Sequence, residues 1–111
     1  MKLEYNECLL KIDELELVLE HPISVAVTDG ERAFVIFDYM AFPPEYQAKN
    51  LVCFNNAGRE IWCAENPLHQ SSSAYANFVE VSPQLVVGNF AGWEMCINKD
   101  SGKVQGLKWT K

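Results

Sequence analysis

Histidine and cysteine are the residues of this chain best suited to catalysis, and their positions do not suggest an active site. His21 directly precedes Pro22 at the end of an extended segment, and His69 lies in a polar loop. A cysteine nucleophile needs an exposed turn and a nearby base, and no cysteine occupies such a turn. The serine run at 71–73 is typical of a linker. The sequence therefore predicts no catalytic residue and a protein that is not an enzyme.

Patterns that bind metal ions or phosphate are also missing from the sequence. Zinc sites need closely spaced cysteine or histidine ligands, whereas the cysteines here are widely separated in apolar or alternating stretches. That setting predicts that the four cysteines are small apolar side chains within strands and form no disulfides. They are Cys8, Cys53, Cys63 and Cys96. The acidic residues near the N-terminus lack the glycine-punctuated loop that binds calcium, and no glycine-rich phosphate loop occurs. We therefore expect no metal ion and no cofactor.

The net charge of −6 is concentrated in the first quarter of the chain. Residues 1–31 contain eight acidic residues and two lysines, whereas residues 32–111 are balanced. This asymmetry is typical of a face that meets a partner of opposite charge; the alternative is that it serves solubility. Nucleic acid and anionic membranes are not expected as partners, because both require clustered basic residues. The residues expected to supply the partner-binding charge are Glu14, Glu16, Glu20, Asp29 and Glu31.

An aromatic loop at residues 39–49 is the second candidate binding feature. It carries Tyr39, Phe42 and Tyr46 around a di-proline, in a stretch that would ordinarily be polar. Loops on a rigid scaffold often carry binding residues, and aromatic side chains dominate interface energetics. The alternative is that the aromatic rings fold back and cover a sheet edge. The two interpretations are compatible, and we expect these three residues to contact a partner.

Length and strand pattern predict a single all-β domain over residues 1–111. Short β-rich runs alternate with turn signals such as Asp29-Gly30, a strong hairpin marker. The order of strands and turns in the first half is repeated in the second half. The predicted organisation is an acidic segment at 1–22, a four-stranded unit at 23–64, a linker loop at 65–73 and a second four-stranded unit at 74–111.

Several local details are less determined by the pattern. Residues 8–15 fit either a short helix or a strand, because their apolar spacing suits both. Leucines at 15, 17 and 19 alternate with acids, which predicts a strand with one buried face. Cys53 and Cys63 are equally spaced about a turn and are expected to face each other across a hairpin. The three tryptophans are expected in the core: Trp62, Trp93 and Trp109.

The first residues and the longest apolar run bear on location. The N-terminal stretch has no basic flank followed by an apolar run, so a secretory signal is not predicted. The longest apolar run, at 33–37, is far shorter than a membrane-spanning helix requires. We therefore expect a soluble, cytoplasmic protein.

Each four-stranded unit resembles a blade of a quinoprotein-type β-propeller. The resemblance is carried by the turn at 98–103 (Asn-Lys-Asp-Ser-Gly-Lys) and by the turn and tryptophan strand at 58–62 (Gly-Arg-Glu-Ile-Trp). Two blades are too few to close a propeller ring. The resemblance therefore implies two sheets packed as a sandwich or rolled into a barrel, with edges that leave room for a homodimer. It implies no cofactor, because a quinone site needs the closed ring.

The whole chain also resembles small stand-alone bacterial proteins, some of which act as immunity proteins against toxins. The segments 50–54 (Asn-Leu-Val-Cys-Phe) and 58–65 (Gly-Arg-Glu-Ile-Trp-Cys-Ala-Glu) carry this resemblance. Toxins that attack nucleic acid tend to be basic, so an acidic inhibitor suits them. The leading hypothesis is an immunity protein or inhibitor that neutralises a basic, nuclease-type toxin. One alternative is a β module that binds a small ligand or docks in an assembly. A second alternative is an enzyme, which predicts that His21 or His69 lies in a concave site beside a carboxylate.

Overall fold

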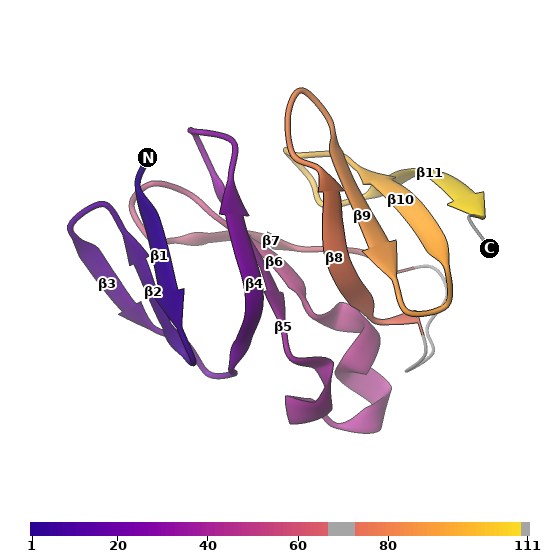
Figure 1. Ribbon diagram of the computed structural model, residues 1–111, viewed down its shortest axis with the longest axis horizontal. Helices are drawn as coiled ribbons and strands as arrows, with labels where there is room; N and C mark the ends of the chain where they lie inside the picture. Colours follow the sequence, from indigo (N-terminus) through magenta and orange to yellow (C-terminus); the bar gives the residue numbers. More distant parts are fainter. Residues whose placement is uncertain (67–72, 110–111) are drawn as a thin grey trace.

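The computed structural model describes residues 1–66 and 73–109, and these residues are all-β, which confirms the predicted class. His69 and the serines at 71 and 72 lie outside the described residues. The strands form three antiparallel sheets, which we call the N-terminal, middle and C-terminal sheets (Figure 1). No helix in the described part of the chain is long and apolar enough to cross a membrane.

The three sheets follow one another along the chain, and each is a simple meander. The N-terminal sheet consists of β1 (Leu3–Asn6), β2 (Leu9–Ile12) and β3 (Leu15–Val18). The middle sheet consists of β4 (Ile23–Thr28), β5 (Ala33–Phe37), β6 (Leu51–Phe54) and β7 (Glu60–Cys63). The C-terminal sheet consists of β8 (Tyr75–Glu80), β9 (Leu85–Asn89), β10 (Trp93–Ile97) and β11 (Val104–Trp109). Two short 3-10 helices, η1 (Tyr39–Ala41) and η2 (Pro44–Lys49), connect β5 to β6.

The N-terminal sheet corrects the prediction for this part of the chain. Of the two alternatives for residues 8–15, the helix is wrong, because these residues form β2, the turns on either side of it and the first residue of β3. The turns are tight, with positive φ at Glu7 (52°) and Asp13 (53°), a backbone conformation that suits two-residue hairpin turns. Alternation in β3 is only partly reflected in burial: Leu17 packs into the core, whereas Leu15 stays exposed.

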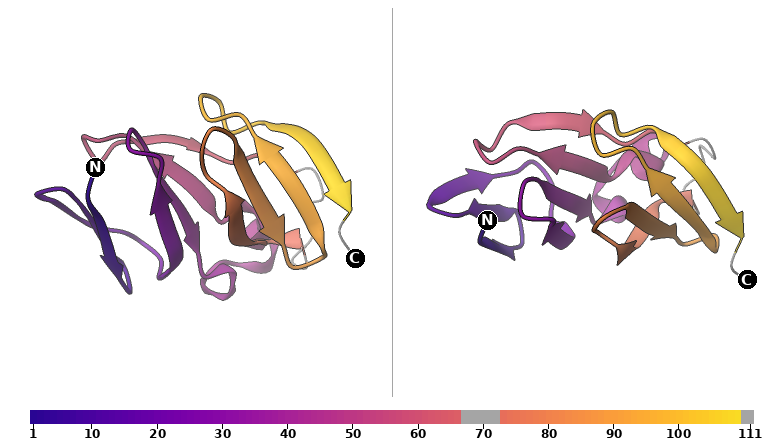
Figure 2. Two further views of the ribbon diagram at one scale, coloured as in Figure 1. Left: turned by 45° about the horizontal axis from the view of Figure 1, so that its top comes forward. Right: turned by 90° about the horizontal axis from the view of Figure 1, so that it is seen from above.

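The middle sheet is covered on both faces, and this gives the molecule three layers (Figure 2). Every residue of β5 is buried, as expected for a strand between two layers. Phe34 and Trp62 face the C-terminal sheet, where Tyr75, Val87 and Met95 meet them. The opposite face of the middle sheet packs against Leu10, Ile12 and Leu17 of the N-terminal sheet; its residues there include Val35, Val52 and Phe54. The predicted arrangement had two packed units, whereas the structure has a third layer, the N-terminal sheet.

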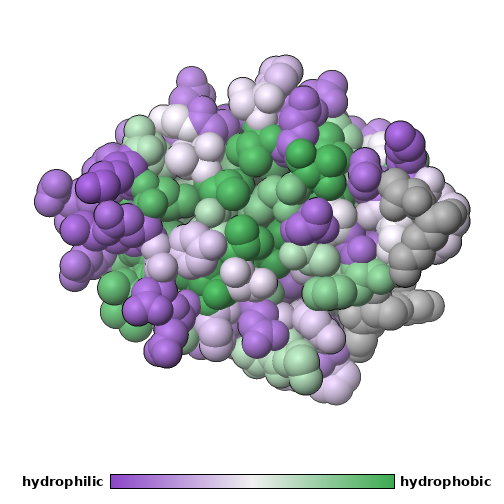
Figure 3. Space-filling model, in the orientation of Figure 1, coloured by the Kyte–Doolittle hydropathy of each residue, from purple (hydrophilic) through white to green (hydrophobic). Residues whose placement is uncertain are grey.

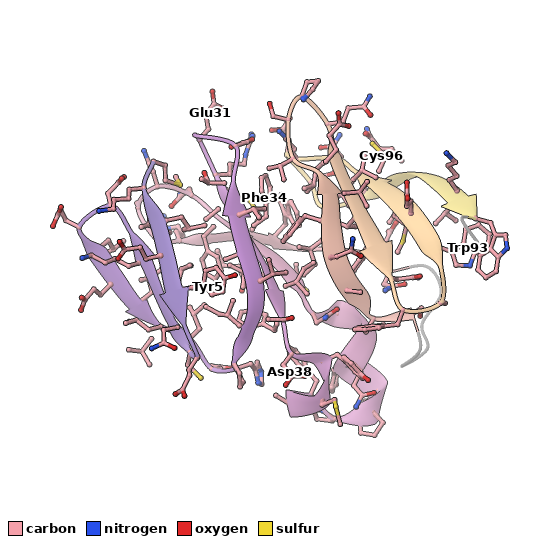
Figure 4. The ribbon with its side chains drawn as sticks, viewed as in Figure 1. Tyr5, Glu31, Phe34, Asp38, Trp93 and Cys96 are labelled. Carbon is pink, nitrogen blue, oxygen red and sulfur yellow. The ribbon has the colours of Figure 1, made fainter. Side chains whose placement is uncertain are left out.

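Two expectations about individual side chains are wrong. Only Trp62 of the three tryptophans is buried. Trp93 and Trp109 pack against each other with their rings tilted by 60° and their centroids 5.1 Å apart, and Trp109 is 51% exposed. Figure 4 shows Trp93 at the far end of the C-terminal sheet, away from the core. Cys53 pairs with Trp62 across the hairpin, while Cys63 pairs with Val52. Paired residues share a face, so the two thiols lie on opposite faces of the middle sheet.

Polar contacts join the middle and C-terminal sheets at both ends. At one end, the fully buried Asn50 donates hydrogen bonds from Nδ2 to Phe37 O and Tyr75 O and accepts one at Oδ1 from Tyr75 N, each 2.9 Å. At the other end, Trp62 Nε1 donates to Lys99 O at 2.7 Å. Gly102 lies so close to this ring that a Cβ would come within 2.6 Å of it, so the turn requires glycine. These contacts fix the two sheets to each other.

Replacing Asn50 tests whether this buried amide holds the two sheets together. Asn50→Ala would leave three buried backbone groups without partners, and we expect the free energy of unfolding to fall by about 3 kcal/mol. Asn56, on an exposed turn, provides the matched control, and Asn56→Ala should change stability by less than about 0.5 kcal/mol. Urea unfolding measures both values. Equal effects of the two substitutions would contradict this role of Asn50.

Candidate functional site

A groove of about 410 Å³ lies between the N-terminal and middle sheets. It forms because the N-terminal sheet has three strands and the middle sheet has four, so the N-terminal sheet leaves part of the facing surface uncovered. The floor is apolar and comes from strands β5 and β6 and from the segment after η1: Phe37, Phe42, Val52 and Phe54. Val18 and Leu19 form the wall at the end of β3. We call this site the A groove.

Five polar side chains complete the lining of the A groove: Glu20, His21, Lys49, Glu60 and Cys63. His21 stacks on Phe42 with ring centroids 4.1 Å apart, so the imidazole forms part of the wall. Glu60 and Cys63 belong to β7, and their residues are exposed because the N-terminal sheet does not extend over that strand. A largely apolar cavity with a few polar groups at its rim is the usual form of a binding site.

Cys63 supplies the only thiol among the residues that line the A groove, and its surroundings do not activate it. Its Sγ donates to Lys49 O at 3.4 Å. Although the residue is exposed, neighbouring side chains partly shield its sulfur from water. This desolvation, together with the Glu60 carboxylate, raises the pKa of Cys63, and the Lys49 ammonium opposes the effect only in part. Thiolate is the reactive form, so this thiol is protonated and weakly reactive near neutral pH. The geometry therefore suits binding better than nucleophilic catalysis.

Other chemistry has little support elsewhere in the described residues. Burial raises the pKa of Cys53 to about 12, and all four cysteines are free thiols. In residues 1–66 and 73–109, no group of three or more histidine, cysteine or acidic side chains is arranged to hold a metal ion. The described part of the chain therefore offers a groove, charged surfaces and sheet edges as its candidate sites.

The predicted acidic residues fall into two groups. Glu14, Glu16 and Glu20 are exposed on the β2–β3 turn, on β3 and just after β3. Figure 3 shows hydrophilic residues gathered at this end of the molecule, over the N-terminal sheet. Glu31 is exposed at the tip of the β4–β5 turn (Figure 4) and does not line the A groove. Of the five predicted acids, only Glu20 lines the groove.

Asp29 is engaged within the chain. Its Oδ2 lies 2.8 Å from Lys99 Nζ, and only 7% of its side chain is exposed. Its Oδ1 accepts hydrogen bonds from the amides of Glu31 and Arg32, both 2.9 Å. Burial alone would raise the pKa of Asp29, but the hydrogen bond from Lys99 and the two amides outweigh it and lower the pKa. The carboxylate therefore joins the β4–β5 turn to the β10–β11 turn.

The aromatic loop divides between its two interpretations. Phe42 folds back over the middle sheet and lines the A groove. Tyr39 packs against Phe90, which directly follows β9, with ring centroids 5.1 Å apart. Tyr46 is 50% exposed, with Lys49 Nζ 5.7 Å from its ring centroid. The structure thus brings Glu20 and Phe42 to one site and places Tyr46 on the exposed side of η2.

The family comparison covers all of these elements. The family described as a domain of unknown function (DUF7957) matches residues 1–109. The chain belongs to this family. The DUF7957 match includes all three sheets and every residue that lines the A groove. No curated protein matches the chain.

Sequence reasoning missed most of the A groove in this DUF7957 chain. Val18 and Glu60 were not assigned to any site, and Lys49 was only the last residue of the aromatic loop. Cys63 was expected only as a small strand side chain facing Cys53, and His21 was considered only as a catalytic base. The sequence does carry one indication of the groove. Residues 3–18 are long enough for only three strands, one fewer than in the sheet that they cover. That signal required the three-stranded meander to be recognised first.

The ion pair of Asp29 predicts a pH-dependent contribution to stability. Because the pKa of Asp29 is lowered on folding, its contribution is complete above the ordinary aspartate range of about 4 and is lost as the pH falls through the lower folded value. Asp29→Asn should cost about 2 kcal/mol at pH 7 and much less at pH 3, by urea unfolding. Asp100→Asn is the control, since that side chain is 82% exposed, and should have little effect at either pH. A cost at Asp29 that is independent of pH would refute this assignment.

The environment of Cys63 predicts the effect of removing its neighbouring carboxylate. Glu60→Gln should lower the pKa of Cys63, because the negative charge that opposes the thiolate is gone. The pH dependence of alkylation by iodoacetamide, followed at the Cys63 peptide by mass spectrometry, should move to lower pH. Lys49→Met should move it to higher pH, and Glu4→Gln on the N-terminal sheet should not move it. An unchanged profile in both groove variants would show that neither charge acts on the thiol.

Proposed function

We propose that this chain is a non-catalytic binding protein that recognises a basic partner protein through its N-terminal sheet and the adjoining A groove. The supporting observation is that exposed acids and an apolar cavity occur at one end of the molecule. The N-terminal sheet and its flanking turns carry six acidic residues and two lysines. Lys2 lies 3.6 Å from Glu4, so one of the two lysines is itself engaged with an acid. A partner with basic residues and an apolar anchor would complement both features.

The class of partner that we favour is a basic, nuclease-type toxin, with this chain as its immunity protein or inhibitor. The resemblance of residues 50–65 to bacterial immunity proteins supports this class. Enzymes that act on nucleic acid carry basic surfaces, and an acidic inhibitor gains association rate from long-range attraction. In this proposal Glu14, Glu16 and Glu20 supply the charge, together with Glu31 on the neighbouring turn. Phe42 contributes to the apolar groove, and Tyr39 of η1 and Tyr46 of η2 supply aromatic surface.

A small ligand is the second candidate, and the dimensions of the A groove support it. Its volume lies within the range of ligand pockets, and its lining combines an apolar floor with a few polar groups. This alternative predicts that exposed acids far from the groove, such as Glu14, have no effect on binding. The two functions therefore differ in their dependence on charge.

The finer description of the fold is also a proposal. We infer that the two four-stranded sheets are related as propeller-like blades, and that they pack as a sandwich within the layered fold. The repeated turn before a tryptophan strand supports this relation. A homodimer formed through sheet edges is compatible with it, and sedimentation equilibrium would detect one. Cytoplasmic location follows from the same hypothesis, since an immunity protein meets its toxin inside the cell.

Affinity capture with charge variants tests the proposed function. Tagged protein is incubated with extract of its host cells at low and high salt, and the affinity of the main captured protein is then measured. Replacing Glu14, Glu16 and Glu20 together by Gln should weaken binding at low salt at least about tenfold. The control replaces Glu45, Glu65 and Glu80 by Gln, which removes the same charge from other exposed positions, and should change affinity less than about threefold.

Two outcomes would count against the proposal. Equal losses in the two triple variants would mean that net charge matters and the N-terminal sheet does not. A monomer that captures no basic protein would favour the small-ligand alternative.

A further inference from the structure

The N-terminal sheet is one strand narrower than the sheet on which it lies. The middle and C-terminal sheets each have four strands, and the N-terminal sheet has three, ending at β3. Within the described residues, β3 pairs only with β2, so its other edge is open. We propose that this edge accepts an extended segment of the partner, which adds as a fourth strand and covers the A groove. This inference rests on the proposed function and specifies how the partner is held.

The open edge of β3 presents backbone groups that can pair. Leu19 N donates to Cys8 O at 2.8 Å, so these residues form a hydrogen-bonded pair of the β2–β3 ladder. Such pairs alternate along an antiparallel ladder, and the residues between them direct their amide and carbonyl groups outward. With the observed register, the outward groups belong to Glu16 and Val18. Val18 is also 84% exposed, more than any other large apolar residue in the described part of the chain.

The surface beneath the vacant position matches an added strand. On β7, Glu60 pairs with Phe54 and Cys63 pairs with Val52, so both side chains lie on the face turned toward the N-terminal sheet. Trp62, on the opposite face, is buried by the C-terminal sheet. A fourth strand beside β3 would cover β7 in the way that the C-terminal sheet covers Trp62. Strands in a sheet are spaced by about 4.8 Å and stacked sheets by about 10 Å, which sets the size of this vacancy.

Cross-strand charges specify the chemistry of the segment. Register places Glu4 opposite Lys11, and Lys11 opposite Glu16, so charge alternates across the outer face of the sheet and ends on an acid at the open edge. The residue added opposite Glu16 is therefore favoured as lysine or arginine. The position opposite Leu19 faces inward and favours an apolar side chain in the A groove. The occupant is an extended segment of about five residues in which basic and apolar residues alternate.

The edge of β11 is less suited to the same role. Lys103 precedes that strand and Lys108 lies within it, and lysine at a sheet edge discourages pairing with a basic segment. The β3 edge has no lysine and adjoins the apolar groove. Charge and shape thus favour β3 for a basic occupant.

The first test uses a synthetic peptide with free ends blocked and the sequence Lys-Leu-Lys-Phe-Lys-Val. Titrated into the full chain, it should shift the backbone NMR signals of Glu16 and Val18 and slow their amide hydrogen exchange. The matched peptide has the same side chains but N-methyl groups on alternate amides, which prevents strand pairing on the methylated edge. It should bind at least about tenfold more weakly. Equal binding of both peptides, or shifts confined to another sheet edge, would overturn the inference.

The second test changes the edge itself. Val18→Pro removes an outward amide without removing a hydrogen bond to β2, and proline is tolerated on edge strands. It should abolish peptide binding, whereas Val18→Thr, which keeps the amide, should retain it. Should Val18→Pro fail to fold, the peptide pair still decides the question in the unaltered chain. A captured basic partner that binds Val18→Pro as tightly as the unaltered chain would overturn strand addition and leave the proposed function standing.

Discussion

The burial of β5 on both faces is the constraint on which the rest of the structure depends. Each residue from Ala33 to Phe37 is buried, so the middle sheet must be covered by one layer on each side. The C-terminal sheet supplies one layer with four strands, and the N-terminal sheet supplies the other with three. Because the second cover is narrower, the face of β7 is only partly hidden, whereas every residue of β6 is buried. The A groove is a direct consequence of this difference between the two covers.

Polar contacts make one of these interfaces more specific than the other. Between the middle and C-terminal sheets, the amide of Asn50 and the ion pair of Asp29 with Lys99 act at opposite ends of the apolar core. Such groups are stable when buried only if their partners are precisely placed, so they fix the orientation of the two sheets. The N-terminal sheet is joined by apolar side chains and by Ile23 N donating to Glu7 O at 2.7 Å. The candidate site therefore has a well-fixed floor on the middle sheet and a wall on the N-terminal sheet that is held mainly by apolar contacts.

The sequence predicts the strands that are marked by local signals such as turns and alternating apolar residues. The eight strands between residues 23 and 109 are present because turns such as Asp29-Gly30 and alternating apolar residues mark them. The N-terminal sheet was less visible, since its turns use Glu7 and Asp13 in place of glycine and its strands have only four residues. Apolar residues at that spacing also fit a helix, and the choice depends on packing against the middle sheet.

The candidate site was harder to predict because it depends on non-local properties. A bulge between Cys53 and Phe54 shifts the register of β6 and β7, and a shift of one residue moves a side chain to the opposite face. Equal spacing from the turn therefore misplaced Cys63, which belongs to the groove. Likewise, the partner of Asp29 is 70 residues away along the chain, so its engagement could not be read from the local charge pattern.

The composition of the β3 edge bears on which partners the chain could accept. An open edge is a hazard, because a second copy of the same chain can pair with it. Two β3 strands paired with each other would bring the acids at 14, 16 and 20 of one copy against those of the other, and like charges across a ladder are destabilising. A basic segment meets the opposite situation, since each acid gains a counter-charge. The same residues that would attract a basic partner thus also discourage self-pairing at this edge, which is the combination that specificity requires.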